Sequence, residues 1–396
     1  MAKRKFQLPR EEELTKEQDK AIALPEDGQY LIVGAPGTGK SVVALQRVLK
    51  LKQKYDNKNY VFLVYNRMLE SVTLQLIDSN LVGTTIVSYL YKLYWHLFKE
   101  SVPQIEPYKP DYDLVVSKIK ELDCDIRPLH LIIDEGQDMP PQFYDALQYA
   151  GYEHFFIVAD QNQRIEAEYN SSREDLTNLL GLDVEDVIEL KTNFRNTRPI
   201  AALANHFYTD LSSPCPTLPD KDSLEIPTFF ENIDSQDCCE MILREADKDD
   251  RNLIGVIVAT NKQRFFYMEN LTKIELELDN PKPIISSYSS SSKKADIDFS
   301  QGGIVILNDK STKGLEFDIV FIVLDGFCIY NNDMDNMKKR FYVMTSRAIE
   351  KLVLLGGDNI KPEIDQLLPT DMNIFKRVSA RNNESSRAIQ FDDIPF

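Results

Sequence analysis

The sequence predicts an α/β protein with two domains, each organised around a parallel sheet. Three observations support this fold class: 396 residues are enough for two hydrophobic cores, a glycine-rich loop joins an apolar run to an amphipathic run near the N-terminus, and alternating strand and helix patterns restart at about residue 196. With 43% hydrophobic and 28% charged residues, the composition is that of a globular protein.

Composition and charge exclude several classes of protein. No apolar run reaches the roughly 18 residues that span a membrane, and the N-terminus lacks a signal-peptide core, so we expect a cytoplasmic protein with no membrane contact. The five cysteines are scattered, which favours reduced thiols over a zinc site or disulfides. The net charge of −17 argues against broad adhesion to nucleic acid, so any such contact must be a local groove.

The glycine-rich loop follows the apolar run at 30–33 and precedes the helical pattern at 42–51. Glycines let backbone N–H groups face a phosphate chain, Lys40 neutralises the terminal phosphates, and the Ser41 hydroxyl can ligate Mg²⁺. The flanking strand and helix favour a nucleotide-binding loop over an ordinary glycine turn. The residues assigned to this loop are Gly34, Ala35, Gly37, Thr38, Gly39, Lys40 and Ser41.

A short helix is predicted upstream, over residues 14–22. Thr15 and Gln18 have the spacing of a capping box, which is one explanation of the glutamine. The other is that Gln18 reads the edge of an adenine, because an amide can donate and accept at once.

Two later strands end in residues suited to phosphoryl transfer, at the edge where parallel sheets bind ligands. The run at 129–133 delivers Asp134 and Glu135, of which one can hold Mg²⁺ and the other can orient or deprotonate the attacking water. The run at 154–159 leads to Gln163, which we expect to contact the terminal phosphate or the attacking water.

The strand at 60–64 ends in candidate nucleic-acid contacts. Tyr65 can stack on a base and Arg67 can hold a phosphate, with Asn66 between them and Ser88 at the start of the next apolar run. The alternative is a tyrosine at the edge of the core and a surface arginine.

Two further expectations concern the stretch that follows. Trp95 lies among other aromatic residues at helical spacing, which predicts packing in the core. Residues 99–127 have prolines, charges and little periodicity, which predicts a short surface insertion.

From about residue 196 the pattern predicts a second parallel sheet. The expected elements are a helix at 199–208, a proline-rich connection at 214–227, an acidic helix at 234–246, strands at 252–259, 303–307 and 317–323, a basic helix at 338–347 and a closing strand at 351–355.

Taken together, these pieces resemble superfamily 1 helicases of the UvrD/Rep type. The matching blocks, in order, are Gln18, Gly34 to Ser41, Tyr65 to Arg67, Asp134 to Asp138, Asp160 to Gln163, Asn193 to Arg195, Lys313 to Asp318 and Tyr342 to Ala348. The resemblance implies two RecA-like P-loop NTPase domains, at 1–195 and 196–376, with accessory domains reduced or absent because the inserted stretches are short. It also implies ATP and Mg²⁺ as cofactors, single-stranded DNA as partner and 3′-to-5′ movement.

By position, the resemblance assigns roles to residues that the pattern alone does not settle. Phe194 would stack on adenine, Gly314 and Glu316 would contact the nucleotide with Glu316 on the ribose, and Arg195 with Arg347 would reach the γ-phosphate. Where the family has a base-stacking tryptophan after its third motif, Tyr169 is the expected substitute.

Residues 377–396 are predicted to be a flexible linker with an acidic C-terminal peptide. That peptide resembles the end of bacterial single-stranded-DNA-binding proteins, where a terminal phenylalanine fills an apolar pocket and its carboxylate pairs with an arginine. It implies recruitment of, or competition for, partners such as a nuclease; the alternatives are an inhibitory contact with the chain's own basic groove and an acidic tail without a partner. The peptide residues are Asp392, Asp393, Ile394, Pro395 and Phe396.

These observations predict an ATP-dependent translocase or helicase on single-stranded DNA, acting in repair, recombination or phage defence. The alternative function is an ATPase switch that senses DNA and recruits a partner nuclease without unwinding.

Overall fold

The computed structural model describes residues 8–9, 11–55, 59–65, 83–107, 109–122, 129–165, 169–288 and 301–379. These residues divide into two compact units. Within the described ranges, the first unit contains residues 8–192 and 210–217, and the second contains residues 193–209 and 218–379. The predicted contacts Asn66 and Arg67 and the predicted peptide at 392–396 lie outside the described residues.

The first unit contains a sheet of six strands in the order β3-β2-β6-β7-β1-β8, and all neighbouring strands are parallel. In register, Leu31 lies opposite Ile157, and Ile32 lies opposite Ile188. The strands are β1 (Gln29–Gly34), β2 (Tyr60–Val64), β3 (Gly83–Thr85), β6 (His130–Ile133), β7 (His154–Ala159) and β8 (Ile188–Leu190).

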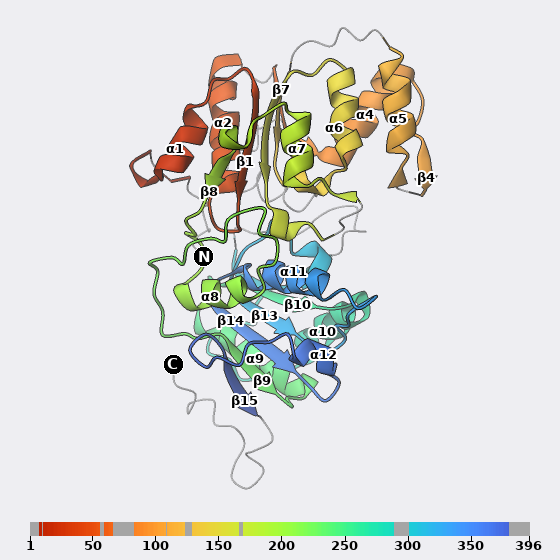
Figure 1. Cartoon of the computed structure of the whole chain (residues 1–396). Helices are drawn as coiled ribbons and strands as arrows, with labels where there is room; N and C mark the ends of the chain where they lie inside the picture. The colour runs from red at the N-terminus through yellow and green to blue at the C-terminus, as the bar shows by residue number, and fades with distance from the viewer. Residues whose placement is uncertain are drawn as a thin grey trace. The chain divides into compact units, whose positions relative to one another are not determined.

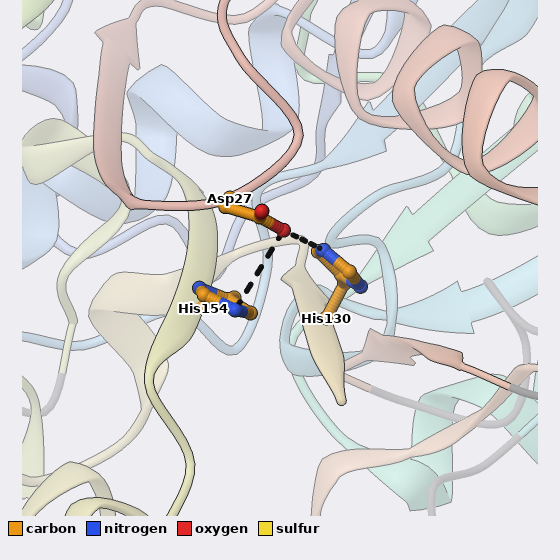
Figure 2. A group of neighbouring side chains, drawn as sticks. All are labelled: Asp27, His130 and His154. Carbon is orange, nitrogen blue, oxygen red and sulfur yellow. Dashed lines mark hydrogen bonds and ion pairs between the residues drawn. The ribbon is translucent and has the colours of Figure 1, made fainter. Parts of the chain in front are cut away.

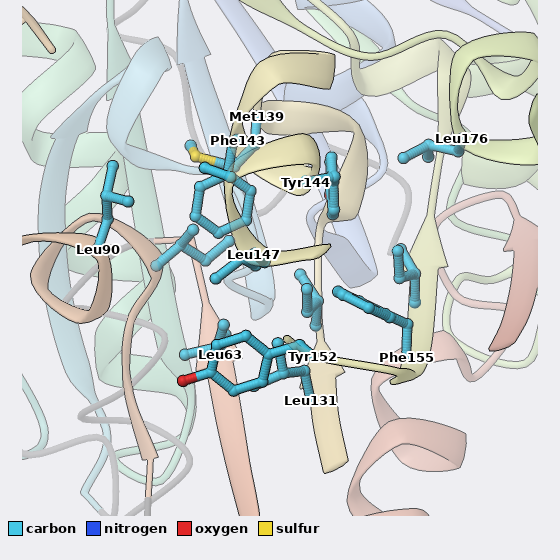
Figure 3. Close-up of a cluster of buried hydrophobic side chains, with 14 of the residues drawn as sticks. Leu63, Leu90, Leu131, Met139, Phe143, Tyr144, Leu147, Tyr152, Phe155 and Leu176 are labelled. Atoms are coloured by element: carbon cyan, nitrogen blue, oxygen red, sulfur yellow. The ribbon is translucent and has the colours of Figure 1, made fainter. Parts of the chain in front are cut away.

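Helices cover both faces of this sheet, and each face has its own hydrophobic cluster because successive strand residues point in opposite directions (Figure 1). Ile32 and Val158 pack with α1 and α2, whereas Leu31, Leu131 and Ile157 pack with α4 to α7. Figure 3 shows the second cluster, built on Phe143, Leu147 and Phe155. The helices are α1 (Lys16–Ala23), α2 (Lys40–Tyr55), α4 (Ile86–Phe98), α5 (Tyr112–Lys120), α6 (Pro141–Tyr149) and α7 (Arg173–Leu179).

Short elements complete the first unit. Antiparallel strands β4 (Gln104–Glu106) and β5 (Lys109–Pro110) form a hairpin within the predicted insertion. The 3₁₀ turns are η1 (Glu11–Glu13), η2 (Gly136–Asp138), η3 (Gln161–Gln163) and η5 (Val184–Asp186).

The second unit contains a parallel sheet of seven strands in the order β11-β12-β10-β13-β14-β9-β15. Its central strands are apolar on both faces, as expected for strands covered on both sides. The strands are β9 (Thr228–Glu231), β10 (Leu253–Val258), β11 (Ile285–Tyr288), β12 (Gly303–Asn308), β13 (Phe317–Val323), β14 (Ala348–Gly356) and β15 (Lys376–Ser379).

One face of this sheet packs against α9 and α10 in a continuous cluster that includes Ile242, Leu271 and Phe321. Helices α8 and α11 contact β14 and each other, and the rings of Phe207 and Phe341 lie 5.3 Å apart. The helices are α8 (Arg198–His206), α9 (Ser235–Lys248), α10 (Asn261–Lys273), α11 (Met334–Thr345) and α12 (Pro362–Asp365), with the 3₁₀ turn η6 (Asp309–Ser311).

The predicted fold class is confirmed, since both sheets are parallel and helices alternate with strands in sequence. Two details differ from the expectations. The strand at 351–355 does not close the second sheet, because β9 and β15 extend it beyond β14. Trp95 is 56% exposed, whereas the adjacent Tyr94 is fully buried. Ser88, Lys92 and His96 recur at helical spacing and mark the polar face of α4, and Trp95 lies on that face. The prediction considered only the aromatic neighbours of Trp95 and was wrong for this reason.

Candidate active site

The glycine-rich loop joins β1 to α2 at the carboxyl edge of the first sheet. Gly37 and Gly39 have φ values of 78° and 86°, in the left-handed region that favours glycine. Gly34 meets a different constraint, because a Cβ there would lie 2.6 Å from the hydroxyl oxygen of Thr38. The N–H and hydroxyl of Thr38 both donate to the carbonyl of Ala35, at 3.3 and 2.8 Å. The predicted loop residues therefore form a tight turn that larger side chains would disrupt.

Lys40 lies at the first position of α2 and is buried. Its ammonium group donates to the carbonyl of Ala35 at 3.0 Å and lies 3.8 Å from the carboxylate of Asp160. Asp160 directly follows β7, so the lysine is held between the glycine-rich loop and the end of a central strand. The sequence predicted Lys40 but not its acidic partner.

Asp134 and Glu135 follow β6 as predicted, and both are buried. Burial and the neighbouring charge of Glu135 raise the pKa of Asp134 to about 6, although a hydrogen bond from the Ser41 hydroxyl and the charge of Lys40 act in the opposite direction. A hydroxyl beside a buried carboxylate that favours a compensating positive charge is a suitable donor set for Mg²⁺. Ser41 and Asp134, the two predicted metal ligands, are therefore brought together.

Glu135 adopts a left-handed backbone conformation, with φ 56° and ψ 42°. For a glutamate this conformation costs on the order of 1–3 kcal/mol, and such strain is concentrated at functional sites. The Glu135 N–H donates to a carboxylate oxygen of Asp134 at 2.9 Å, which fixes the two acidic groups relative to each other.

Gln137 connects the carboxylates to the loop after β7. Its amide nitrogen donates to Glu135 at 2.7 Å, and its amide oxygen accepts from the N–H of Asp160 at 2.9 Å. Gln163 in turn donates to the carboxylate of Asp160 at 2.8 Å. The ends of β6 and β7 thus share one buried hydrogen-bonded cluster. The sequence predicted Glu135 and Gln163 but not Gln137 and Asp160, which connect them. The pattern that could have indicated this connection is the glutamine two positions after Glu135.

Gln18 uses both ends of its amide. Its oxygen accepts from the N–H of Thr15 at 2.9 Å, and the Thr15 hydroxyl accepts from the N–H of Gln18 at 3.1 Å, so the capping box is present. Its nitrogen donates to the carbonyl of Thr38 at 3.0 Å. The residue therefore links the start of α1 to the glycine-rich loop, a contact that the sequence did not predict.

In the second unit, two predicted residues form an ion pair: Arg195 Nε donates to a carboxylate oxygen of Glu316 at 2.7 Å. The backbone around Arg195 is shaped by Asn193, whose side-chain oxygen accepts from the Arg195 N–H at 3.0 Å. Asn196 donates to the carbonyls of Ser346 and Ala348, on either side of Arg347. The segment at 193–196 is thereby attached to the end of α11.

The remaining predicted residues of the second unit differ in exposure. Arg347 is buried, and its guanidinium donates to the carbonyls of Val343 at 2.9 Å and Leu315 at 3.3 Å. Phe194 is 50% exposed, as a stacking residue must be. Gly314 has a φ of 78°, a conformation that favours glycine.

Of the predicted nucleic-acid residues of the first unit, the structure describes Tyr65, Ser88 and Tyr169. Tyr65 is at the exposed end of β2. Ser88 belongs to the N-terminal turn of α4, where its hydroxyl accepts from Thr85 at 2.7 Å. Tyr169 is 45% exposed, and the ammonium group of Lys109 lies 4.2 Å from its ring centroid. Among the helices that are described, none is both long and apolar enough for a bilayer.

The chain is similar to known helicase proteins in two comparisons. A family model for the Schlafen group 3 DNA/RNA helicase domain matches residues 28–270. A protein of Acanthamoeba polyphaga mimivirus, named as a candidate ATP-dependent DNA helicase, is 27% identical over 249 residues, which cover 57% of this chain and 34% of that protein. The chain thus spans about a third of the length of that relative. Both findings support a helicase.

Among solved structures, the C-terminal domain of a possible DNA helicase from Lactobacillus plantarum matches with a TM-score of 0.31 and 14% identity. The match covers 46% of this chain and 98% of that domain. A likeness of this size is too weak to bear on fold or function.

Proposed function

The chain belongs to the Schlafen group 3 DNA/RNA helicase domain family, and from that premise we propose that it couples ATP hydrolysis to movement along single-stranded DNA. The observation that carries the proposal is the buried cluster at the carboxyl edge of the first sheet. It brings together a lysine, a hydroxyl and three carboxylates beside a glycine-rich turn. These are the groups that hold a phosphate chain with its metal ion and orient a water for attack.

Within this cluster the roles divide by chemistry. Lys40 would neutralise the terminal phosphates, and Ser41 with Asp134 would hold Mg²⁺, which supplies the positive charge that the buried carboxylate lacks. Glu135 would orient or deprotonate the attacking water, with Gln137 fixing its carboxylate. In the second unit, Arg195 is the candidate for stabilising transition-state charge.

DNA contact is proposed for Tyr65, Asn66, Arg67, Ser88 and Tyr169, and the exposure of the Tyr169 side chain is consistent with stacking on a base. Movement in the 3′-to-5′ direction is proposed from the helicase resemblance alone. The peptide at 392–396 is proposed to recruit, or compete for, partners of single-stranded-DNA-binding protein, in repair, recombination or phage defence.

The test is ATP hydrolysis by the full chain with no nucleic acid, with single-stranded DNA and with single-stranded RNA, followed by strand displacement on a duplex with a single-stranded tail. We expect stimulation by DNA and its complete loss in Lys40→Ala. Lys262→Ala, which removes an exposed lysine from α10, is the matched control and should hydrolyse ATP normally. Unchanged hydrolysis in Lys40→Ala would refute the assigned phosphate site. Stimulation without strand displacement would favour the alternative function, an ATPase switch that senses DNA.

A further inference from the structure

Three polar side chains meet at the amino edge of the first sheet, opposite the edge that carries the phosphate loop (Figure 2). Asp27 lies between α1 and β1, while His130 and His154 begin β6 and β7. His130 Nε2 lies 2.9 Å and His154 Nε2 lies 3.7 Å from the same carboxylate oxygen of Asp27. The three potential ligand atoms lie within 4.8 Å of one another, so a metal ion and a proton are both candidates for this cluster.

The hydrogen-bond partners of His130 decide whether the cluster suits a metal ion or a proton. Its Nδ1 lies 3.0 Å from the carbonyl oxygen of Asn59, which can only accept a hydrogen bond. Its Nε2 faces Asp27, whose pKa is lowered chiefly by the hydrogen bond from His130, so the carboxylate is ionised and also only accepts. An imidazole between two acceptors satisfies both only when each nitrogen carries a proton. His130 therefore fits this place as a cation.

One ring nitrogen of His154 has to accept a hydrogen bond, whereas both nitrogens of His130 have to donate one. The backbone N–H of Gly28 donates to its Nδ1 at 3.2 Å, so Nδ1 is unprotonated and Nε2 carries the proton of the neutral ring. A metal ligand needs a free lone pair at Nε2, which this tautomer lacks. The rings of His130 and His154 also stack, with centroids 4.9 Å apart and planes at 22°. A metal bound to both nitrogens would have to lie in both ring planes, and near-parallel stacked rings do not allow this.

We infer that protonated His130 and Asp27 form a clamp that positions the segment at 24–28, and through it the helix that carries Gln18 into the nucleotide site. The segment connects α1 to β1, and β1 leads directly into the phosphate loop. The inference rests on the proposed function, because the positioning of Gln18 is measured through the affinity of the chain for nucleotide.

A second cation already holds the same segment. Arg47 of α2 is buried and donates to the carbonyls of Leu24 and Glu26, each at 2.7 Å, and to Pro25 between them. Because arginine keeps its charge, this attachment does not respond to pH. The pair of Asp27 with His130 does respond to pH. It therefore changes the position of the segment, while Arg47 keeps the segment attached to α2.

Other charged groups near the clamp belong to α2 and to the segment itself. Lys54 pairs with Glu26 and also attracts Asp27. His130 stacks against Tyr55, with ring centroids 5.4 Å apart. None of these contacts supplies an acceptor to His130 Nε2 other than Asp27 within the described residues.

The clamp operates within a pH window. Because the pKa of Asp27 is lowered, the carboxylate side of the pair is lost only as pH falls through that lowered value. The histidine side requires a proton on Nε2 of His130, because the carboxylate of Asp27 can only accept a hydrogen bond. The clamp is therefore present only while His130 carries both ring protons.

The protonation state is tested directly by long-range ¹H–¹⁵N spectra of the full chain labelled at histidine, which has only four such residues. Signals are assigned with His130→Gln and His154→Gln. We expect both nitrogens of His130 to be protonated at about pH 6.5, with loss of this state in Asp27→Asn. A singly protonated His130 in the wild type would overturn the inference. So would one tightly bound Zn²⁺ per chain that disappears in Asp27→Asn.

The positioning role is tested by the affinity for a non-hydrolysable ATP analogue between about pH 6 and pH 8.5. The titration of Asp134 affects the wild type and Asp27→Asn alike, so the ratio of their affinities isolates the clamp. We expect the affinity of the wild type relative to Asp27→Asn to fall about two- to five-fold as pH rises. Glu26→Gln is the matched control, since it removes a neighbouring charge without touching the imidazoles, and it should keep the wild-type profile. A wild-type profile in Asp27→Asn would contradict positioning. Absence of binding at every pH would instead refute the proposed function, and the spectra would still test the clamp.

Discussion

Asp134 is a residue at which we expect stability and the proposed ATP hydrolysis to oppose each other. Burial first and the charge of Glu135 second raise its pKa to about 6, so the folded chain binds this proton more tightly than the unfolded chain. Stability therefore falls as pH rises from the ordinary carboxyl range to about 6, and the full penalty remains at higher pH. We expect Asp134→Asn to raise Tm at pH 8 by about 2–4 °C, to give a smaller increase at pH 5, and to abolish ATP hydrolysis.

Calorimetry at the two pH values and a hydrolysis assay measure these effects. Asp145→Asn is a suitable control, because burial also raises the pKa of that carboxyl but it lies on α6, outside the cluster. It should leave hydrolysis intact. An equal change in Tm at both pH values for Asp134→Asn would show that burial of the charge is not the cause.

Gln137 is the residue that the structure adds to the predicted machinery. It orients Glu135 through one hydrogen bond and the Asp160 backbone through another. Gln137→Leu retains the approximate volume but neither bond, so we expect kcat to fall about 10- to 100-fold with the KM for ATP nearly unchanged. Gln148→Leu, on α6, loses one bond to the Leu179 carbonyl and should leave kcat unaffected. A rise in KM without loss of kcat would assign Gln137 to binding instead.

At the scale of elements, α1 combines an N-terminal capping box with a contact to the glycine-rich loop, and substitutions can separate the two. Gln18→Glu keeps an acceptor for the capping box but removes the donor to the Thr38 carbonyl. Thr15→Val removes the cap and leaves the contact with the phosphate loop. We expect Gln18→Glu to raise the KM for ATP several-fold, and Thr15→Val to lower the free energy of unfolding by about 1 kcal/mol with little change in KM. Equal effects of both changes on KM would show that Gln18 acts only through the cap.

Elements with a strong local signal could be predicted from the sequence. Apolar runs identified the central strands, the glycine-rich loop identified the boundary between β1 and α2, and Thr15 identified the start of α1. The strands β9 and β15, the last two of the second sheet, could not be predicted, because such short strands are stabilised by pairing with their neighbours more than by their own residues.

The site was predictable where strand ends carry their own chemistry and unpredictable where contacts join distant segments. Asp134 and Glu135 follow an apolar run, and the edge of a parallel sheet then brings them to Lys40. The pairing of Arg195 with Glu316 depends on the folded path between them, which no local pattern encodes. The cluster of Asp27 with two histidines was missed for the same reason.

At the scale of the whole molecule, the residues assigned to ATP are divided between the two units. Lys40, Asp134 and Glu135 belong to the first unit, and Arg195 and Glu316 belong to the second. The groups proposed to bind phosphates and the arginine proposed to act on the transition state therefore belong to different units. We expect binding and hydrolysis to respond to different substitutions.

Arg195→Ala tests this division. We expect it to lower the single-turnover rate of ATP hydrolysis by about 10²- to 10³-fold and to leave the affinity for nucleotide nearly unchanged, because an arginine that acts on developing charge contributes little to ground-state binding. Glu316→Gln removes the negative partner of Arg195, so it should weaken nucleotide binding if Glu316 holds the ribose and slow hydrolysis much less than Arg195→Ala does. Rapid-quench kinetics and equilibrium titration with an ATP analogue separate the two effects. Normal hydrolysis in Arg195→Ala would mean that the second unit contributes no arginine from this position to catalysis, and the proposed coupling of ATP turnover to movement would then depend on Arg347 alone.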